Sequence, residues 1–340
     1  MRRWSLWLLG LGALTLAAGC VWQSAASQKQ AYTRQLFAMD TLMEFTAYGG
    51  NAEAALDEAL GEVQRLDALL SAANPDSEVS RLNREAGGTV SQDTAAVLNM
   101  ALETYEETGG LFDCTIYPLV KLWGFPNQEY RVPAEAEIEN ALPLVDSSRL
   151  RLDGGVLYME PGQAMDFGGV GKGYAAARVM EIFREHGISS GMVSLGGNIQ
   201  VLGKKPDKSL WRVGVRDPEG ADYFAVLTLE DQAAVTSGGY ERYFEAEGET
   251  YIHILDPRTG RPAESDLLSV TVVSEDGARA DALSTALFLM GLEDAADFWR
   301  KDGGFDLVLV TEDRQVFITE GLEGSFESDK SFAVLRSAAF

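Results

Sequence analysis

Histidine and cysteine are scarce in this chain of 340 residues, which holds only two of each. A structural zinc site uses three or four Cys and His ligands, so the composition argues against a zinc-binding fold. The cysteines are Cys20 and Cys114, and no histidine stands near Cys114 in the sequence. We therefore interpret Cys114 as a small buried residue and not as a nucleophile.

Basic residues are also few, with 28 Lys and Arg against 52 Asp and Glu, which gives a formal net charge of −24. A nucleic acid partner requires a basic face, and so does docking on an anionic membrane surface. Both are disfavoured by this charge. A polyanionic ligand would have to be held by a metal ion or by a local set of donors.

The N-terminus has the features of a processing segment. Two arginines precede an apolar run over 4–18 that is short for a membrane span, and Leu-Ala-Ala-Gly-Cys follows at 16–20. This pattern resembles a bacterial lipoprotein signal. It predicts a signal peptide at 1–19, a lipid on Cys20, a polar tether over 20–35 and a location on the outer face of the cell membrane. An uncleaved anchor would give the same outward topology.

The remaining chain, 36–340, is expected to form one catalytic unit, because 46% hydrophobic residues suffice for a packed core and no linker interrupts it. Apolar periodicity predicts helices over 51–70, 91–108, 134–142, 174–186, 280–290 and 292–300. Strands are expected over 36–47, 155–160, 192–195, 199–202, 211–216, 223–229, 240–246, 251–255, 268–275, 306–311, 315–319 and 332–336. Since helices and strands do not alternate, the fold class is α+β, with mixed, largely antiparallel sheets and flanking helices.

A glycine-rich stretch, Met165 to Tyr174, connects an expected strand to an expected helix. Its glycines allow a close backbone approach, and the amides at a helix start suit an anion. The stretch is not a Walker A loop, because Gly173 and not Ser or Thr follows Lys172, and its spacing also misses G-x-G-x-x-G. Tight packing explains such a turn equally well.

Oxygen donors are the better candidates for a metal site. Asp281, Ser284 and Thr285 share one face of the helix expected from residue 280, and a carboxylate with hydroxyl and carbonyl oxygens suits Mg²⁺. His253 stands at the end of a strand before the turn Asp256–Gly260, where it can meet a ligand. His186 stands at a helix end, where its role is interpreted as structural.

Taken in order, several stretches resemble the bacterial flavin transferase family, ApbE. They are 39–41, 77–83, 110–113, 118–120, 122–125, 166–174, 194–198, 236–240, 253–260 and 280–285. No single stretch is decisive, but their joint order is specific.

The resemblance implies FAD:protein FMN transferase activity, in which FMN from FAD is linked through its phosphate to a Thr or Ser hydroxyl of a partner flavoprotein, with release of AMP. Mg²⁺ is implied as the cofactor, held by Asp281, Thr285, the Gly169 carbonyl and Ser284. The residues implied to line the FAD site are Met39, Leu111, Phe112, Asp113, Asp166, Lys172 and Leu255. His253 is implied to lie near the pyrophosphate.

Some points stay open at this stage. Ala73 replaces an aromatic residue that is frequent in the family, which puts flavin stacking there in question, and Ser284 stands where some members have an acid. Asp281 and His253 are both candidates for the base that activates the hydroxyl. Two other functions fit the same residues: hydrolysis of FAD to FMN and AMP, and flavin binding without catalysis.

Overall fold

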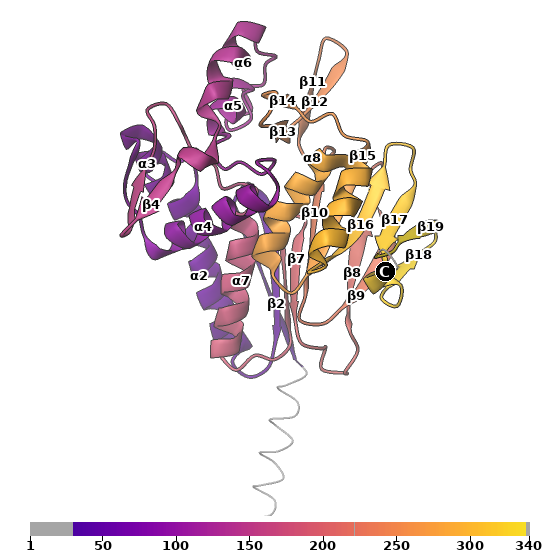
Figure 1. Cartoon of the computed structure of the whole chain (residues 1–340). Helices are drawn as coiled ribbons and strands as arrows, with labels where there is room; N and C mark the ends of the chain where they lie inside the picture. Colours follow the sequence, from indigo (N-terminus) through magenta and orange to yellow (C-terminus); the bar gives the residue numbers. More distant parts are fainter. Residues whose placement is uncertain (1–29, 221, 338–340) are drawn as a thin grey trace, which may run out of the picture.

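The computed structural model describes residues 30–220 and 222–337, and its centre is one nine-stranded sheet (Figure 1). The strands run in the spatial order β1 (Ala31–Ala38), β2 (Thr41–Tyr48), β6 (Gly191–Leu195), β7 (Asn198–Leu202), β10 (Ala233–Gly238), β15 (Leu267–Ser274), β16 (Asp306–Thr311), β17 (Val316–Thr319) and β19 (Phe332–Leu335). Each neighbouring pair is antiparallel except β17 with β19. The expected α+β class with largely antiparallel sheets is confirmed.

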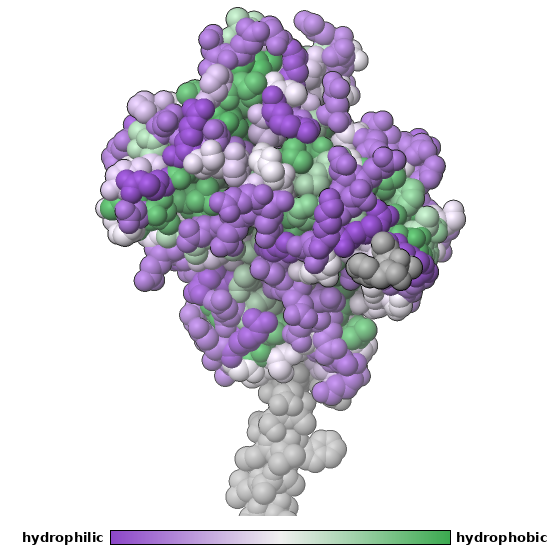
Figure 2. Space-filling model, viewed as in Figure 1, coloured by the Kyte–Doolittle hydropathy of each residue, from purple (hydrophilic) through white to green (hydrophobic). Residues whose placement is uncertain are grey.

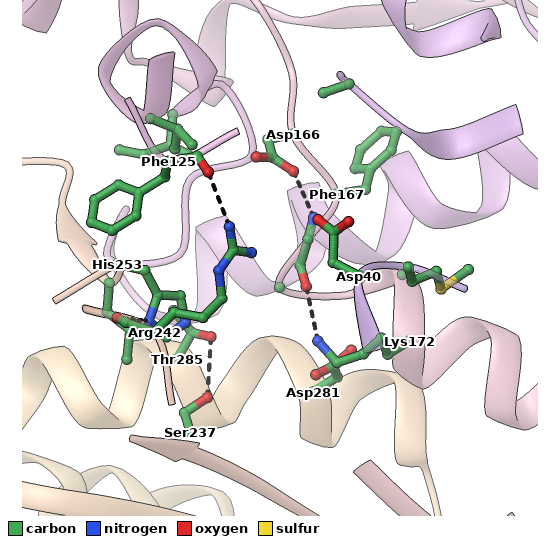
Figure 3. Close-up of a pocket in the computed structure, with 18 of the residues that line it drawn as sticks. Asp40, Phe125, Asp166, Phe167, Lys172, Ser237, Arg242, His253, Asp281 and Thr285 are labelled. Carbon is green, nitrogen blue, oxygen red and sulfur yellow. Dashed lines mark hydrogen bonds between the residues drawn. The ribbon is translucent and has the colours of Figure 1, made fainter. Parts of the chain in front are cut away.

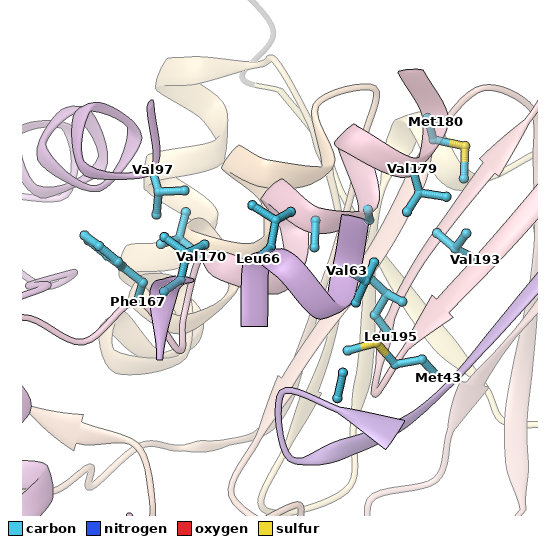
Figure 4. Close-up of a cluster of buried hydrophobic side chains, with 14 of the residues drawn as sticks. Met43, Val63, Leu66, Val97, Phe167, Val170, Val179, Met180, Val193 and Leu195 are labelled. Atoms are coloured by element: carbon cyan, nitrogen blue, oxygen red, sulfur yellow. The ribbon is translucent and has the colours of Figure 1, made fainter. Parts of the chain in front are cut away.

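Helices cover one face of this sheet, as Figure 1 shows. They are α2 (Ala52–Leu70), α7 (Gly171–Glu185) and α8 (Gly277–Asp302), with α3 (Glu78–Glu85) and α4 (Gln92–Glu107) outside them. The buried side of β2 meets the apolar sides of α2 and α7 in one cluster, in which Met43, Val63, Leu66, Val179 and Leu195 lie together (Figure 4). Burial of these apolar side chains is what fixes the helices on the sheet.

A second, three-stranded sheet covers part of the opposite face, in the order β18 (Phe326–Ser328), β9 (Tyr223–Leu229), β8 (Trp211–Arg216). Trp211, Val213 and Leu227 form a separate apolar cluster there with Val273 and Val308 of the large sheet. The protein is therefore layered, with helices, a large sheet and a small sheet.

The remaining elements lie around one end of the sheet. They are a sheet of β3 (Gly87–Thr89), β5 (Val156–Tyr158) and β4 (Arg151–Asp153), the hairpins β11 (Tyr243–Ala246) with β12 (Glu249–Ile252) and β13 (Leu255–Asp256) with β14 (Arg261–Pro262), helices α5 (Tyr117–Leu122) and α6 (Glu135–Ala141), and 3₁₀ turns at Leu142–Leu144 and Ser147–Arg149. A third 3₁₀ turn, Glu320–Leu322, follows β17 and contacts β16 at the other end of the sheet. Phe244 stacks on Tyr251 with ring centroids 5.1 Å apart and contacts Phe125, so aromatic packing joins the β11–β12 hairpin to the segment after α5. Figure 2 shows polar residues over most of the face seen.

The N-terminal hairpin differs from the expectation of one strand over 36–47. The chain turns at Met39 and Asp40, whose φ angles of 47° and 59° are left-handed, and β1 and β2 pair on either side. The strand β1 also takes in residues 31–35, which the sequence assigned to the tether. The predicted signal peptide and Cys20 lie outside the described residues.

Three further expectations need correction or refinement. The helix α7 begins at Gly171, so part of the glycine-rich stretch forms its first turn. The two helices expected over 280–290 and 292–300 are present as α8 with a break at Gly291, where φ is 78°. The strand β10 was not expected, because its Thr-Ser-Gly end was interpreted as a loop. In the described part of the chain, no helix has the length and apolar character needed to cross a membrane.

Candidate functional site

A cavity of about 500 Å³ opens between the helical layer and the small elements at one end of the large sheet (Figure 3). The structure brings most of the predicted site residues to its wall: Met39, Leu111, Phe112, Asp113, Asp166, Gly169, Lys172, His253, Leu255, Asp281 and Thr285. They come from five separate stretches of sequence. A cavity of this size, whose wall combines apolar residues with many polar and charged ones, suits a ligand of cofactor size that has both apolar and charged parts.

Contact between two helices positions Asp281. The backbone N–H of Gly173 in α7 donates a hydrogen bond of 2.7 Å to Oδ2 of Asp281 in α8. A Cβ atom on Gly173 would lie 2.6 Å from the carbonyl oxygen of Gly277 and 2.7 Å from Cβ of Asp281. Glycine is thus required here, because any side chain would push the two helices apart.

The Asp281 carboxylate is buried without a matching cation. Its residue is 5% exposed, and burial raises its pKa, while the positive charge of Lys172 acts in the opposite direction. Among the described residues no Lys or Arg forms an ion pair with it. A buried carboxylate with only amide donors is an unfavourable arrangement that a bound cation would relieve.

The donors around Asp281 fit a hard divalent cation. Thr285 lines the cavity one turn along α8, and its Oγ1 lies 3.5 Å from the position that a Cβ on Gly169 would take. Within residues 30–220 and 222–337, no three His, Cys, Asp or Glu side chains gather as a metal cluster. The candidate set instead combines one carboxylate with hydroxyl and carbonyl oxygens, which Mg²⁺ accepts together with water and phosphate oxygens.

Ser284 departs from the predicted set. It is fully buried beneath the cavity and does not line it. Its hydroxyl donates to the Asp281 carbonyl at 2.8 Å and pairs with Ser237 Oγ at 2.7 Å. Because both hydrogen-bonding directions are used, Ser284 supports the helix from below and is not placed as a ligand.

His253 lies on the opposite wall from Lys172 and Asp281 (Figure 3). Its Nδ1 lies 3.0 Å from the carbonyl oxygen of Arg242, so Nδ1 carries the proton and Nε2 is left as an acceptor. Burial, followed by the positive charge of Arg242, lowers the pKa of His253 to about 4. The ring is therefore neutral at pH 7 and able to take up a proton.

The glycine-rich stretch arranges two further charges. Asp166 Oδ1 accepts a hydrogen bond of 2.8 Å from the N–H of Gly168, and Lys172 Nζ donates one of 3.4 Å to the Gly168 carbonyl. Burial raises the pKa of Asp166, against the positive charges of Arg242 and Lys172. Lys172 is thus held at the cavity as a point charge near the position of Asp281.

Three predicted residues have structural partners. The Asp113 carboxylate accepts hydrogen bonds from Thr115 and Ser147. Asp113 borders the cavity, but its side chain is used to fix the loop. His186 Nε2 lies 2.7 Å from a Glu58 carboxylate oxygen at the end of α7, in agreement with its structural interpretation. Cys114 is buried, and burial raises the pKa of its thiol to about 12, which makes it a poor nucleophile.

The cavity also contains residues to which the sequence analysis assigned no role. Asp40, Ser237, Glu241 and Arg242 all line it, and the Arg242 guanidinium donates to the Phe125 carbonyl at 3.2 Å. Asp40 and Ser237 lie inside the recognised stretches 39–41 and 236–240, and Glu241 and Arg242 directly follow the second of these. Their proximity to those motifs was the available signal, but their direction into the cavity depends on turns that the sequence does not reveal.

Both the sequence and the structure are similar to those of known proteins. The sequence matches the model of the ApbE family over residues 39–309. It is 33% identical to the FAD:protein FMN transferase of Treponema pallidum over 86% of this chain and 87% of the relative, and 34% identical to that of Klebsiella pneumoniae over 77% and 85%. The ApbE protein of Thermotoga maritima superposes with a TM-score of 0.82 at 33% identity, covering 86% of this chain and 98% of that one. The flavin transferase ApbE of Vibrio cholerae gives a TM-score of 0.77 at 25% identity, covering 87% and 100%.

Proposed function

This chain belongs to the ApbE family, and from that premise we propose that it is an FAD:protein FMN transferase, which moves FMN from FAD to a Thr or Ser hydroxyl of a partner flavoprotein and releases AMP. The observation that carries the proposal is the gathering of Asp281, Thr285, Lys172 and His253 around one cavity. Carboxylate, hydroxyl, cation and neutral imidazole are the groups that transfer of a phosphoryl-linked group requires.

Magnesium is the proposed cofactor of this site. Asp281 and Thr285 would hold it, with the Gly169 carbonyl as a third protein ligand, because these oxygens line the cavity and the carboxylate lacks an ion-pair partner among the described residues. When bound, Mg²⁺ supplies positive charge to the pyrophosphate oxygens. Lys172 adds a second positive charge on the same side of the cavity.

The proton of the acceptor hydroxyl must be removed, and the geometry favours His253 over Asp281 for this role. Asp281 already accepts from Gly173 and is the proposed metal ligand, whereas Nε2 of His253 is free to accept a proton because Nδ1 is bonded to the Arg242 carbonyl. The hydroxyl oxygen then bonds to the phosphorus that carries riboflavin, and its proton passes to Nε2. The bond from that phosphorus to the bridging oxygen breaks, and AMP leaves with the bridging oxygen.

The function is tested by incubating residues 30–340 with FAD, Mg²⁺ and an unflavinylated acceptor domain. Mass spectrometry of the acceptor should show one FMN added on Thr or Ser, and AMP should appear in equal amount. AMP released at the same rate without acceptor identifies an FAD pyrophosphatase instead. FAD recovered intact by a folded protein identifies a flavin-binding protein without catalysis.

A lipid on Cys20 is proposed as the means of attachment to the outer face of the cell membrane. The support is the sequence pattern over 16–20 and the start of β1 only eleven positions after Cys20. After expression of the full chain in bacteria, mass spectrometry should show a mature protein that begins at Cys20 and carries a lipid there. A protein that keeps residues 1–19, or that begins at Cys20 without added lipid mass, would contradict the proposal.

A further inference from the structure

One side chain that lines the cavity has no role in the site described above. It belongs to Asn198, the first residue of β7 and the last of the stretch 194–198. The residue is 1% exposed, and neither Nδ2 nor Oδ1 of its amide has a hydrogen-bond partner among the described residues. A buried amide without partners costs free energy, so its presence at this point needs a reason other than stability.

The turn between β6 and β7 does not depend on the Asn198 side chain. Gly196 and Gly197 form this turn with left-handed φ angles of 59° and 91°, which glycine adopts without strain. Asparagine side chains that support turns bond to the backbone nearby, and Asn198 makes no such bond within the described chain. Its backbone pairs with Leu195 of β6 and Val235 of β10, and a β-branched residue would suit such a central strand better.

The Asn198 side chain points toward the helical layer. Ile199 and Val201 of β7 pack in the apolar cluster beneath the small sheet, so Asn198 and Gln200 face the opposite way. Gln200 reaches the first turn of α8, where its Oε1 lies 3.0 Å from the position that a Cβ on Gly277 would take. Gln200 does not line the cavity, whereas Asn198 does.

The Asp281 carboxylate is the charged group that the Asn198 amide meets. Burial raises its pKa, while the charge of Lys172, the Gly173 N–H and the Asn198 amide act in the opposite direction. The amide is therefore near enough to act as a donor, although no hydrogen bond of normal length and angle joins the two side chains. Oδ2 of Asp281 accepts from Gly173, which leaves Oδ1 for a cation and a second donor. Because a carboxylate repels an amide oxygen, the N–H end of the amide is the end that suits it.

Asn198 lies deeper than the oxygens proposed to bind the cation. It is 1% exposed against 5% for Asp281, and Thr285 is only partly buried where it lines the cavity. Asn198 thus stands behind the carboxylate, on the side of the sheet. Carboxylates that bind metals are themselves held by hydrogen bonds, and loss of such a donor weakens metal binding about 10–100-fold.

We propose that Asn198 is a positioning residue of the metal site, whose Nδ2 donates to the Asp281 carboxylate and holds it in the orientation that binds the cation. This rests on the proposed function, because the cation is the Mg²⁺ of the proposed transfer. The role gives the buried amide a partner and explains a polar residue at the centre of the sheet. It also gives a function to the stretch 194–198, whose glycine turn brings the start of β7 to the cavity.

The test measures metal binding separately from transfer in wild type and three variants. Asn198→Leu keeps a similar shape but cannot donate, and Asn198→Cys offers only a weak donor but a strong ligand for soft metals. Gln200→Leu is the matched control, a buried amide on the same face of the same strand that does not line the cavity. The Kd of Mn²⁺ alone is measured from the EPR signal of the free ion, and that of Cd²⁺ by competition. Thermal unfolding without metal monitors the fold.

Asn198→Leu should raise the Kd of Mn²⁺ about 10–100-fold and the Mg²⁺ concentration for half-maximal transfer by a similar factor, while kcat at saturating Mg²⁺ falls less. Without metal it should unfold at the wild-type temperature or above, because it removes an unpartnered polar group. Asn198→Cys should also weaken Mn²⁺ binding, without a gain in preference for Cd²⁺. Gln200→Leu should bind Mn²⁺ as the wild type does.

Unchanged Mn²⁺ binding in either folded Asn198 variant would overturn the proposal. Equal weakening in Gln200→Leu would do so too, because it would show a general effect of the core. A strong preference of Asn198→Cys for Cd²⁺ would make residue 198 a ligand and not a positioning residue. A wild type that binds no Mn²⁺ would reject the metal site and this role with it. A wild type that binds Mn²⁺ but forms no covalent product rejects the proposed transfer, and the Mn²⁺ comparison still decides the role of Asn198.

Discussion

Replacing Asp281 with Asn separates the contribution of the carboxylate charge from that of the fold. Asn can still accept the 2.7 Å hydrogen bond from Gly173. It removes the negative charge of a carboxylate that has no ion-pair partner among the described residues, although the charge of Lys172 acts on it. Loss of metal-based stabilisation of the transition state should cost several kcal/mol, or about a hundredfold or more in transfer rate. FAD binding should change less, since Asp281 is proposed to hold the metal ion and not the aromatic rings of FAD.

Stability gives the second measurement. The substitution replaces a charge-assisted hydrogen bond by a neutral one, which costs about 1 kcal/mol, but it also removes a buried charge, which is favourable. The free energies of unfolding of the metal-free variant and the metal-free wild type should therefore differ by no more than about 1 kcal/mol near pH 8. Because burial raises the pKa of Asp281, the wild-type carboxylate contributes stability at low pH that is lost as pH rises through that pKa. The stability of Asp281→Asn should not show this decrease with rising pH.

Binding of Mg²⁺ with FAD should then distinguish the two proteins. At one hundred times Kd the wild type gains about 2.7 kcal/mol, which raises Tm by several degrees, and the variant should gain much less. The control is Asp276→Asn on the same helix, where Asp276 caps the first turn through the N–H groups of Ala278 and Arg279 and Asn caps equally well. Transfer by Asp281→Asn at the wild-type rate under limiting Mg²⁺ would refute the assignment of Asp281 to the metal.

Three other outcomes are expected. If His253 is the base, a plot of kcat/KM against pH should decrease on its acidic side only as the pH approaches about 4, and His253→Asn should remove this acidic limb. An acidic limb near pH 6.5 would contradict the lowered pKa of His253. Arg242→Leu should move the limb upward, because the positive charge of Arg242 lowers the pKa of His253, and an unmoved limb would show that burial alone sets it. Gly173→Ala should destabilise the protein by about 1–3 kcal/mol and impair transfer. Gly171→Ala should be tolerated, because the added Cβ would meet no atom from another part of the chain within 4 Å; equal thermal unfolding of the two variants would contradict the close helix contact.

The long helices and the separate functional motifs were accessible from sequence because local patterns determine them. The stripe over 51–70 and the Ser91 cap fix α2 and α4 to within about a residue. The hairpin turn was hidden, since Met39 and Asp40 adopt left-handed angles without glycine. The strand β10 was hidden because its pairing with β7 and β15 outweighs the turn character of its Thr-Ser-Gly end.

At the site, the spacing of residues along α8 predicted two hydroxyl ligands for the metal, but the structure directs only one of these hydroxyls into the cavity. Residues three and four positions after Asp281 lie on either side of it, and both were expected to turn toward the metal. The packing of α8 on β10 decides between them: Ser284 faces Ser237 below, and Thr285 faces the cavity. Such a choice depends on how the helix is rotated against the sheet, which a single sequence does not specify.

The strand β1 also sets a length scale for the proposed lipid anchor. It begins at Ala31 and ends beside the Met39–Asp40 turn at the cavity, a span of about 26 Å at the usual rise of a strand. The chain takes eleven residue steps from Cys20 to Ala31, which can add at most about 40 Å. The enzyme would then sample a hemisphere of about 65 Å radius above its anchor. If the lipid anchor is present, acceptor hydroxyls on the same membrane within this radius would meet the cavity at a high effective concentration, and those held farther out would not be reached.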